Sequence, residues 1–213
     1  IRLSLVGSEM CIRDRAIDID SNFYLPIFMT SLAYSNQYEL EFWFSTIYNR
    51  PHLLEQAKKW CLRACEKTNR MSVQQQIHAN WVYACRFETP NDQIKYLKQL
   101  IQLDDQSTGS YFNLGNCYIE LQQYEKAIPE YEKALEIYDK WKITPSWVLY
   151  YNYLGKSYQK NGQYRKAEKV YKKAEQYFPD DIELTGWHGI LYRLMGDTVK
   201  AVSYTHLRAP RLR

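Results

Sequence analysis

The 213-residue chain contains little cysteine for its length, with five residues in all. Small secreted domains that depend on disulfides carry cysteine at a much higher density. The composition therefore excludes a disulfide scaffold and favours a reducing compartment, and we expect a cytoplasmic location.

Long apolar runs are also absent. A membrane-spanning helix needs about 18 or more consecutive apolar residues. The longest candidate, residues 23–34, is interrupted by Pro26, Thr30 and Ser31, so the sequence predicts no membrane span. Disorder is excluded as well, because 15% of the residues are aromatic.

The chain lacks a complete motif for nucleotide binding. The triplet Gly155-Lys156-Ser157 matches the end of a phosphate-binding P-loop, but the glycine that the loop requires five residues earlier is replaced by Tyr150. The surrounding residues read as helix, whereas a P-loop joins a strand to a helix. We therefore interpret the triplet as a helix-packing segment and predict no cofactor.

Motifs for metal binding and catalysis are incomplete too. Cys61 and Cys65 would share one helix face, and His78 or Cys85 could add ligands, but the paired cysteines at two-residue spacing that typify zinc sites are absent. We expect these cysteines to lie in the core and predict no metal site. The histidines at 52, 78 and 188 have no spacing that suggests a triad with a Ser or Cys nucleophile. We therefore predict no catalytic residues and no enzyme activity.

Two segments of the chain repeat each other. YFNLGNCY begins at Tyr111 and YNYLGKSY at Tyr151, and each is followed at the same offsets by a tyrosine, an alanine, a second tyrosine and a second alanine. An aromatic, Leu-Gly, Tyr, Ala, aromatic, Ala and a final Pro179 across 34 residues resembles the tetratricopeptide repeat (TPR) family. The resemblance implies an all-α fold, a right-handed superhelix of stacked antiparallel helix pairs (an α-solenoid), and a non-catalytic protein-binding role.

Packing explains the spacing of the repeat. Two helices that cross closely need small residues at the crossing, which would be Gly115 and Gly155 on the first helices and Ala127 and Ala167 on the second. Pro179 would stop the second helix of its pair. Because neither helix alone can bury its apolar face, each pair should be stable only when stacked on a neighbour.

Further repeats are weaker. We predict a TPR array over residues 16–201, with degenerate repeats at about 21–69 and 73–105, clear repeats at 108–141 and 148–181, and a truncated repeat at 182–201. An aromatic insertion fills residues 35–48. A second insertion lies between Gly115 and Gly155, whose separation exceeds the 34-residue period by six residues. We expect a frayed C-terminal end, where these apolar side chains would lack a partner helix: Trp187, Ile190, Leu191 and Leu194.

The two ends of the chain differ from the rest. Residues 1–15 and 202–213 resemble translated sequencing-adapter read-through, so we exclude both from the fold and expect the native protein to continue in both directions. They carry net charges of +1 and +3, which together account for the whole net charge of +4. The remaining 186 residues are neutral, which disfavours a nucleic-acid partner.

The first helices of a TPR array line its concave face, and the resemblance places eight residues of the clear repeats there. Their amides, ammonium groups and apolar atoms suit a peptide or protein segment. The predicted contacts are Phe112, Asn116, Ile119, Glu120, Asn152, Lys156, Gln159 and Lys160, joined in the degenerate repeat by His78, Val82 and Arg86.

The TPR subclass that clamps a terminal carboxylate is a poor match. Phe112, Tyr153 and Trp187 stand where its Lys, Asn and Arg would be. We predict a protein-interaction module, and the degenerate upstream pattern also resembles TPR arrays in larger bacterial signalling or regulatory proteins. The alternative is a structural segment of a larger enzyme or sensor that self-associates through the aromatic insertion around Phe42, Trp43 and Phe44.

Overall fold

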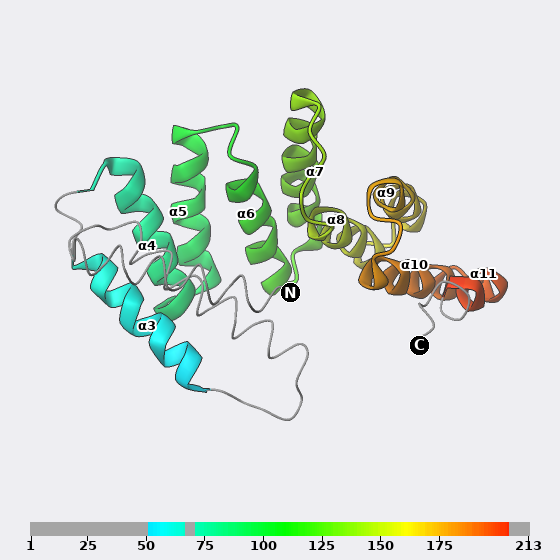
Figure 1. The fold of residues 1–213 in the computed structure, drawn as a ribbon, viewed down its shortest axis with the longest axis horizontal. Helices are drawn as coiled ribbons and strands as arrows, with labels where there is room; N and C mark the ends of the chain where they lie inside the picture. The colour runs from blue at the N-terminus through cyan, green and yellow to red at the C-terminus, as the bar shows by residue number, and fades with distance from the viewer. Residues whose placement is uncertain (1–50, 67–70, 205–213) are drawn as a thin grey trace. The chain divides into compact units, whose positions relative to one another are not determined.

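The computed structural model describes residues 51–66 and 71–204, and every regular element in these two ranges is a helix (Figure 1). The expectation of an all-α fold is therefore confirmed. The predicted aromatic insertion at 35–48 and the first helix of the repeat at 21–69 lie outside the described residues. The helices are α3 (Pro51–Cys65), α4 (Val73–Phe87), α5 (Pro90–Leu103), α6 (Thr108–Glu120), α7 (Tyr124–Trp141), α8 (Leu149–Lys160), α9 (Tyr164–Tyr177), α10 (Ile182–Leu194) and α11 (Thr198–Val202).

The chain divides into two compact units, one ending at Tyr96 and the other beginning at Leu97. In the first unit, α3 packs against α4 around a small apolar core that includes Cys61 and Val82. Ser72 begins α4 with a capping box, in which its side chain accepts from the Gln75 N–H and its own N–H donates to the Gln75 side chain. Two helices were predicted for residues 73–105, and α4 and α5 confirm them.

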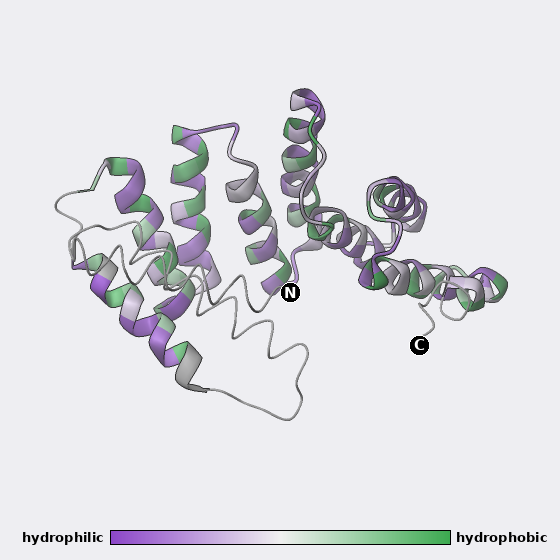
Figure 2. Cartoon of the chain, viewed as in Figure 1, coloured by the Kyte–Doolittle hydropathy of each residue, from purple (hydrophilic) through white to green (hydrophobic). Residues whose placement is uncertain are grey.

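The second unit is a series of helix pairs, α6 with α7, α8 with α9, and α10 with α11. Each helix carries both hydrophobic and hydrophilic residues (Figure 2), and the buried apolar ones pack between neighbouring helices. The predicted close crossing is present, since a Cβ on Gly115 would lie 2.6 Å from Cζ of Tyr131. Ala127 and Ala167 are fully buried, as the repeat pattern predicts.

The six-residue insertion between the clear repeats lengthens both a helix and the connection after it. α7 has 18 residues against 14 in α9, its counterpart in the next repeat. The extra length ends at Lys142, which adopts a left-handed conformation with φ 56° and turns the chain away from the helix axis. The residues from Lys142 to Val148 then lead to α8.

The C-terminal pair departs from expectation at Leu191. This side chain was expected to lack a partner helix, but that prediction is wrong, because it is 0% exposed. α10, which carries Leu191, contacts α8, α9 and the short α11, so it does not lack partner helices. Ile190 and Leu194 are 36% and 53% exposed, as expected for residues on the outer side of the last long helix.

Candidate protein-binding surface

The first helices of the three pairs lie next to one another, since α8 contacts α6 on one side and α10 on the other. All eight residues predicted for the binding face lie on α6 and α8, at equivalent offsets. They fall into two groups, one buried beneath the surface and one with atoms on it. The structure therefore separates residues that the repeat pattern treats alike.

Three of the eight residues are buried, with exposed fractions of 8% for Phe112, 2% for Asn152 and 6% for Gln159. Phe112 packs its ring 4.6 Å from the ring of Tyr150 and 5.7 Å from that of Tyr153. These three residues support the surface from beneath, and the expected apolar contact from Phe112 is used within the fold.

Gln159 and Lys156 both reach the next repeat at Trp187 of α10. Gln159 Nε2 donates to the Trp187 carbonyl oxygen at 3.3 Å. The Lys156 ammonium lies 5.3 Å from the centre of the Trp187 ring, within the range of a cation–π interaction. Trp187 is therefore part of this surface, although the sequence pattern pointed to it only as a departure from the carboxylate clamp and as an apolar residue at a frayed end.

The two asparagines have opposite surroundings. Asn116 is half-buried, and its Oδ1 accepts a 2.6 Å hydrogen bond from the Tyr131 hydroxyl. Both polar side-chain atoms of Asn152 are buried without a hydrogen-bond partner. A buried amide in that state carries a desolvation cost of about 1–3 kcal/mol, so Asn152 is a local weak point beneath the surface.

The remaining members present charge and apolar atoms to solvent. Glu120 and Lys160 are exposed at the ends of α6 and α8, and Ile119 and Lys156 are half-buried. The accessible chemistry is thus the Glu120 carboxylate, two ammonium groups, an isoleucine and the indole of Trp187, whose Nε1 donates to the Glu183 carboxylate at 3.2 Å. Such a surface suits a segment with both acidic and apolar side chains.

The three residues that the degenerate repeat was predicted to add to the binding face lie on α4, in the first unit. Val82 is 2% exposed and belongs to the core. His78 stacks on Trp81 at 5.3 Å, and burial lowers the pKa of His78. Arg86 is half-buried, with Nη1 donating to the Cys85 carbonyl at 3.5 Å. Val82 is therefore buried, and His78 and Arg86 are only partly accessible to a ligand.

The residues considered as candidates for nucleotide or metal binding occupy packing positions. Ser157 of the Gly-Lys-Ser triplet donates to the Tyr153 carbonyl at 2.7 Å inside α8. Cys61 is 1% exposed, and both its hydrogen bond to Cys65 and burial raise the pKa of its thiol. Within residues 51–66 and 71–204, no three His, Cys, Asp or Glu side chains come together in a way that could hold a metal ion.

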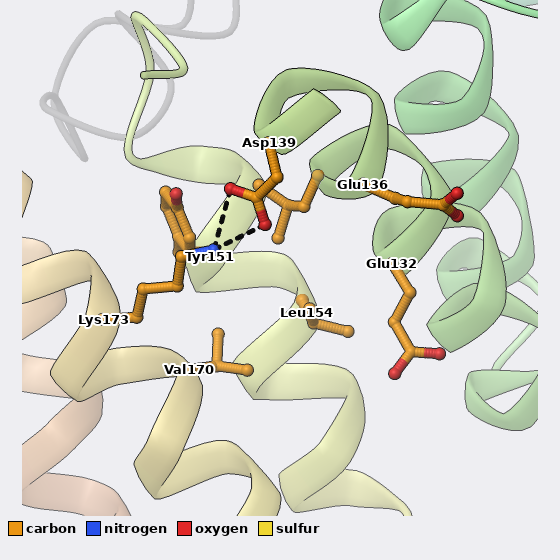
Figure 3. A pocket seen from close by; sticks show the side chains of 8 residues that line it. Glu132, Glu136, Asp139, Tyr151, Leu154, Val170 and Lys173 are labelled. Atoms are coloured by element: carbon orange, nitrogen blue, oxygen red, sulfur yellow. Dashed lines mark hydrogen bonds and ion pairs between the residues drawn. The ribbon is translucent and has the colours of Figure 1, made fainter. Parts of the chain in front are cut away.

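A second surface feature lies between the second helices. A shallow cavity of about 280 Å³ is bounded by α7, α8 and α9 (Figure 3). Lys173 Nζ pairs with both carboxylate oxygens of Asp139, at 3.0 and 2.8 Å, at one end. We call this feature the α7–α9 groove, and its lining residues are Glu132, Leu135, Glu136, Asp139, Tyr151, Leu154, Val170 and Lys173.

The helix pairs and their first-helix surface define an all-helical protein built from stacked antiparallel helix pairs. Residues 106–180 match the family model described as Tetratricopeptide repeat, a range that covers nearly all of the two clear repeats. The TPR resemblance is thereby supported in the part of the chain where the repeats are clearest. Among the described residues, no helix is both long and apolar enough to cross a membrane.

Comparison with known proteins gives the same fold. The chain is 34% identical to BBSome complex member BBS4 of Bos taurus over 92 residues. That stretch is 43% of this chain and 16% of the length of BBS4. The structure of this chain is similar to that of PilW, a type IV pilus biogenesis factor, with a TM-score of 0.70 at 13% identity. The similarity covers 95% of this chain and 84% of PilW. A crystal structure of MamA gives a TM-score of 0.59 at 22% identity over 74% of this chain and 92% of MamA.

A third solved structure, the APC/C hetero-tetramer Cut9-Hcn1, gives a TM-score of 0.71 at 13% identity and covers 96% of this chain and 36% of that one. The TM-scores show that these proteins share the fold of stacked helix pairs. Identities this low carry no information about the ligand.

Proposed function

We propose that the chain is a protein-interaction module that holds a peptide or protein segment against the surface of α6, α8 and α10. The fold and the family match support a protein-interaction scaffold. The observation that carries the choice of surface is the Lys156–Trp187 pair, because it joins an ammonium group and a large apolar ring from two successive repeats.

The chemistry of the proposed site favours a segment with acidic and apolar side chains. Lys156 and Lys160 lie one turn apart on α8, and no acidic residue lies within that turn to neutralise them. Trp187 offers a rigid apolar contact, a residue type that is common among interface hot spots. Glu120 on α6 would orient the ligand by repelling its acidic end.

The wider context follows from the sequence. We propose that this module serves a larger signalling or regulatory protein and acts in the cytoplasm, as the low cysteine content favours. The alternative function is structural, with the repeats joining copies of the chain and no peptide bound.

Selection from a displayed library of random twelve-residue peptides on the immobilised chain tests the proposal. We expect acidic peptides with an aromatic or aliphatic residue to be enriched. Fluorescence anisotropy should then show at least tenfold weaker binding for Lys156→Glu and Lys160→Glu, and weaker binding of the parent at high salt.

Lys169→Glu on α9 is the matched control, because it makes the same charge change at an exposed position outside the proposed site. Circular dichroism should be the same for all three variants. Peptides that bind all of them equally well would refute the site, and failure to enrich any peptide would refute the peptide-binding function.

A further inference from the structure

The connection from α7 to α8 exposes an unusual amount of apolar surface. Trp141, Ile143 and Trp147 are 44%, 56% and 57% exposed. Exposed large apolar side chains commonly occur singly on a protein surface, so three within seven residues make this segment a candidate contact surface. We call residues 141–147 the tryptophan loop.

The tryptophan loop is held in a defined shape. Lys142 N–H donates to the Asp139 carbonyl and Ile143 N–H to the Tyr138 carbonyl, both at 3.1 Å, which closes the end of α7. Pro145, in the middle of the loop, is buried. Because the backbone is fixed at both points, displaying the three apolar side chains requires little further ordering.

The end of α7, from which the loop starts, extends beyond its neighbour α6. The Thr108 hydroxyl at the start of α6 donates to the Tyr138 hydroxyl, so the last turn of α7 extends past the first residue of α6. The projecting segment is basic, since Lys140 and Lys142 are exposed and the loop itself contains no acidic residue.

The α7–α9 groove has complementary properties. Leu135, Leu154 and Val170 are the aliphatic residues of its lining. Figure 3 shows the α7 carboxylates Glu132, Glu136 and Asp139 beside it. Glu132 accepts a hydrogen bond from the Tyr158 hydroxyl and Asp139 is paired with Lys173. Glu136 is 67% exposed, and its ion pair with Lys133, an i,i+3 pair, is too exposed to neutralise it strongly. With about 280 Å³, the groove is smaller than a drug-sized ligand site and is suited to single side chains.

The loop and the groove are adjacent along the chain. The chain leaves the groove at Asp139, two residues before Trp141, and returns to it at Tyr151, four residues after Trp147. The exposure of both tryptophans shows that they do not fill the groove of their own chain. An apolar, basic projection beside an apolar, acidic depression is self-complementary under a two-fold axis.

We propose that this surface binds a second copy of the chain, with the tryptophan loop of each copy inserted into the α7–α9 groove of the other. The apolar side chains of the loop cover the aliphatic residues of the groove, and Lys140 and Lys142 face Glu132 and Glu136. Two identical contacts related by a two-fold axis close the assembly at a dimer. This interface is separate from the proposed peptide surface on α6, α8 and α10.

Sedimentation equilibrium of the full chain tests the proposal. We expect a monomer–dimer equilibrium with a dissociation constant on the order of 100 µM, as for a small interface. Trp147→Ser and Glu136→Lys should each raise that constant at least tenfold. Both side chains are exposed, so both variants should keep the parent's circular dichroism and urea midpoint.

Two combinations make the test specific. Glu136→Lys with Lys142→Glu in one chain exchanges the charges and should restore most of the dimer. Mixing the Trp147→Ser chain with the Glu136→Lys chain should give a heterodimer that is tighter than either homodimer, because one of its two contacts joins an intact loop to an intact groove. Val199→Ser, which removes an 80% exposed apolar residue elsewhere, is the matched control and should leave the dimer unchanged.

Several results would overturn the proposal. They are a chain that stays monomeric at about ten times the expected dissociation constant, a dimer that is insensitive to both single variants, a mixture of the two variants that gains nothing over either alone, and assembly beyond the dimer. Binding of the loop to anionic lipid vesicles by a strictly monomeric chain would assign it to a membrane surface instead and would refute the dimer.

Discussion

The Tyr131 hydroxyl donates a 2.6 Å hydrogen bond to Oδ1 of Asn116, and the next repeat has no equivalent bond. Forty residues on, Tyr171 replaces Tyr131 and Lys156 replaces Asn116. An ammonium group cannot accept a hydrogen bond, and the buried Tyr171 hydroxyl has no hydrogen-bond partner. The second clear repeat therefore lacks an internal hydrogen bond, but it places a positive charge over Trp187 on the proposed binding surface.

This difference predicts opposite results for the same substitution in two repeats. Tyr131→Phe removes a hydrogen bond and should lower the free energy of unfolding by about 1 kcal/mol. Tyr171→Phe removes only an unpartnered buried hydroxyl, so it should leave stability within about 0.5 kcal/mol or raise it. Urea denaturation followed by circular dichroism measures both. Equal losses in the two variants would contradict this account of the pair.

The glycine at the helix crossing gives a second prediction. A Cβ at residue 115 would lie 2.6 Å from Cζ of Tyr131, so Gly115→Ala should force the helices apart at a cost of about 1–3 kcal/mol. On α10, a Cβ at Gly186 would meet no neighbouring heavy atom within 4 Å, so Gly186→Ala should gain up to about 1 kcal/mol from helix propensity. Thermal unfolding of both variants checks the sign, and a stabilised Gly115→Ala would refute the close crossing.

The sequence predicted those parts of the fold that depend on local spacing. The repeat spacing was enough to place small residues, Gly115 with Ala127 and Gly155 with Ala167, where two helices cross, but it did not identify Tyr131 as the side chain that lies against Gly115. Leu191 was predicted wrongly because the helix that follows, α11, is only five residues long and its existence depends on contacts with α10.

The binding surface could be predicted only by position. The repeat offsets selected Phe112, Asn152 and Gln159 together with Lys156 and Lys160, but the exposure of each depends on the size of the neighbouring side chain. Gln159 is buried because it bonds to the Trp187 backbone in the following repeat. Contacts of that kind join distant residues, so their geometry is not encoded in the spacing of either repeat alone.

The start of α10 provides a third prediction, which concerns the helix that carries Trp187. Asp181 caps this helix, since its Oδ1 accepts from the Leu184 N–H at 2.8 Å. Asp181→Ala should destabilise the chain by about 1 kcal/mol. Its exposed neighbour offers a control, because Asp180→Ala removes the same charge without a cap. Hydrogen exchange should show faster amide exchange at the start of α10 in Asp181→Ala alone, and identical exchange in both variants would exclude the cap.

The buried His188 on α10 is the basis of a pH prediction. The side chain is 0% exposed, its Nδ1 lies 2.7 Å from Oε1 of Glu175, and its ring stacks on Tyr192 at 4.8 Å. Burial lowers the pKa of His188, and this effect outweighs the hydrogen bond and negative charge of Glu175, which act to raise it. The folded state therefore favours the neutral imidazole more than the unfolded state does.

The sign of the pH effect follows from that shift. Above the ordinary histidine pKa of 6.5 both states are neutral at this residue, and below it the unfolded chain takes up the proton first. Stability should thus fall as pH drops below about 6.5, by at most about 1.4 kcal/mol per pH unit from this group. Urea unfolding at pH 7.5, 6.5 and 5.5 should show a smaller decline for His188→Leu than for the parent. Some decline should persist in the variant, because burial also lowers the pKa of His78. Parallel pH profiles would show that His188 does not titrate differently in the folded and unfolded states.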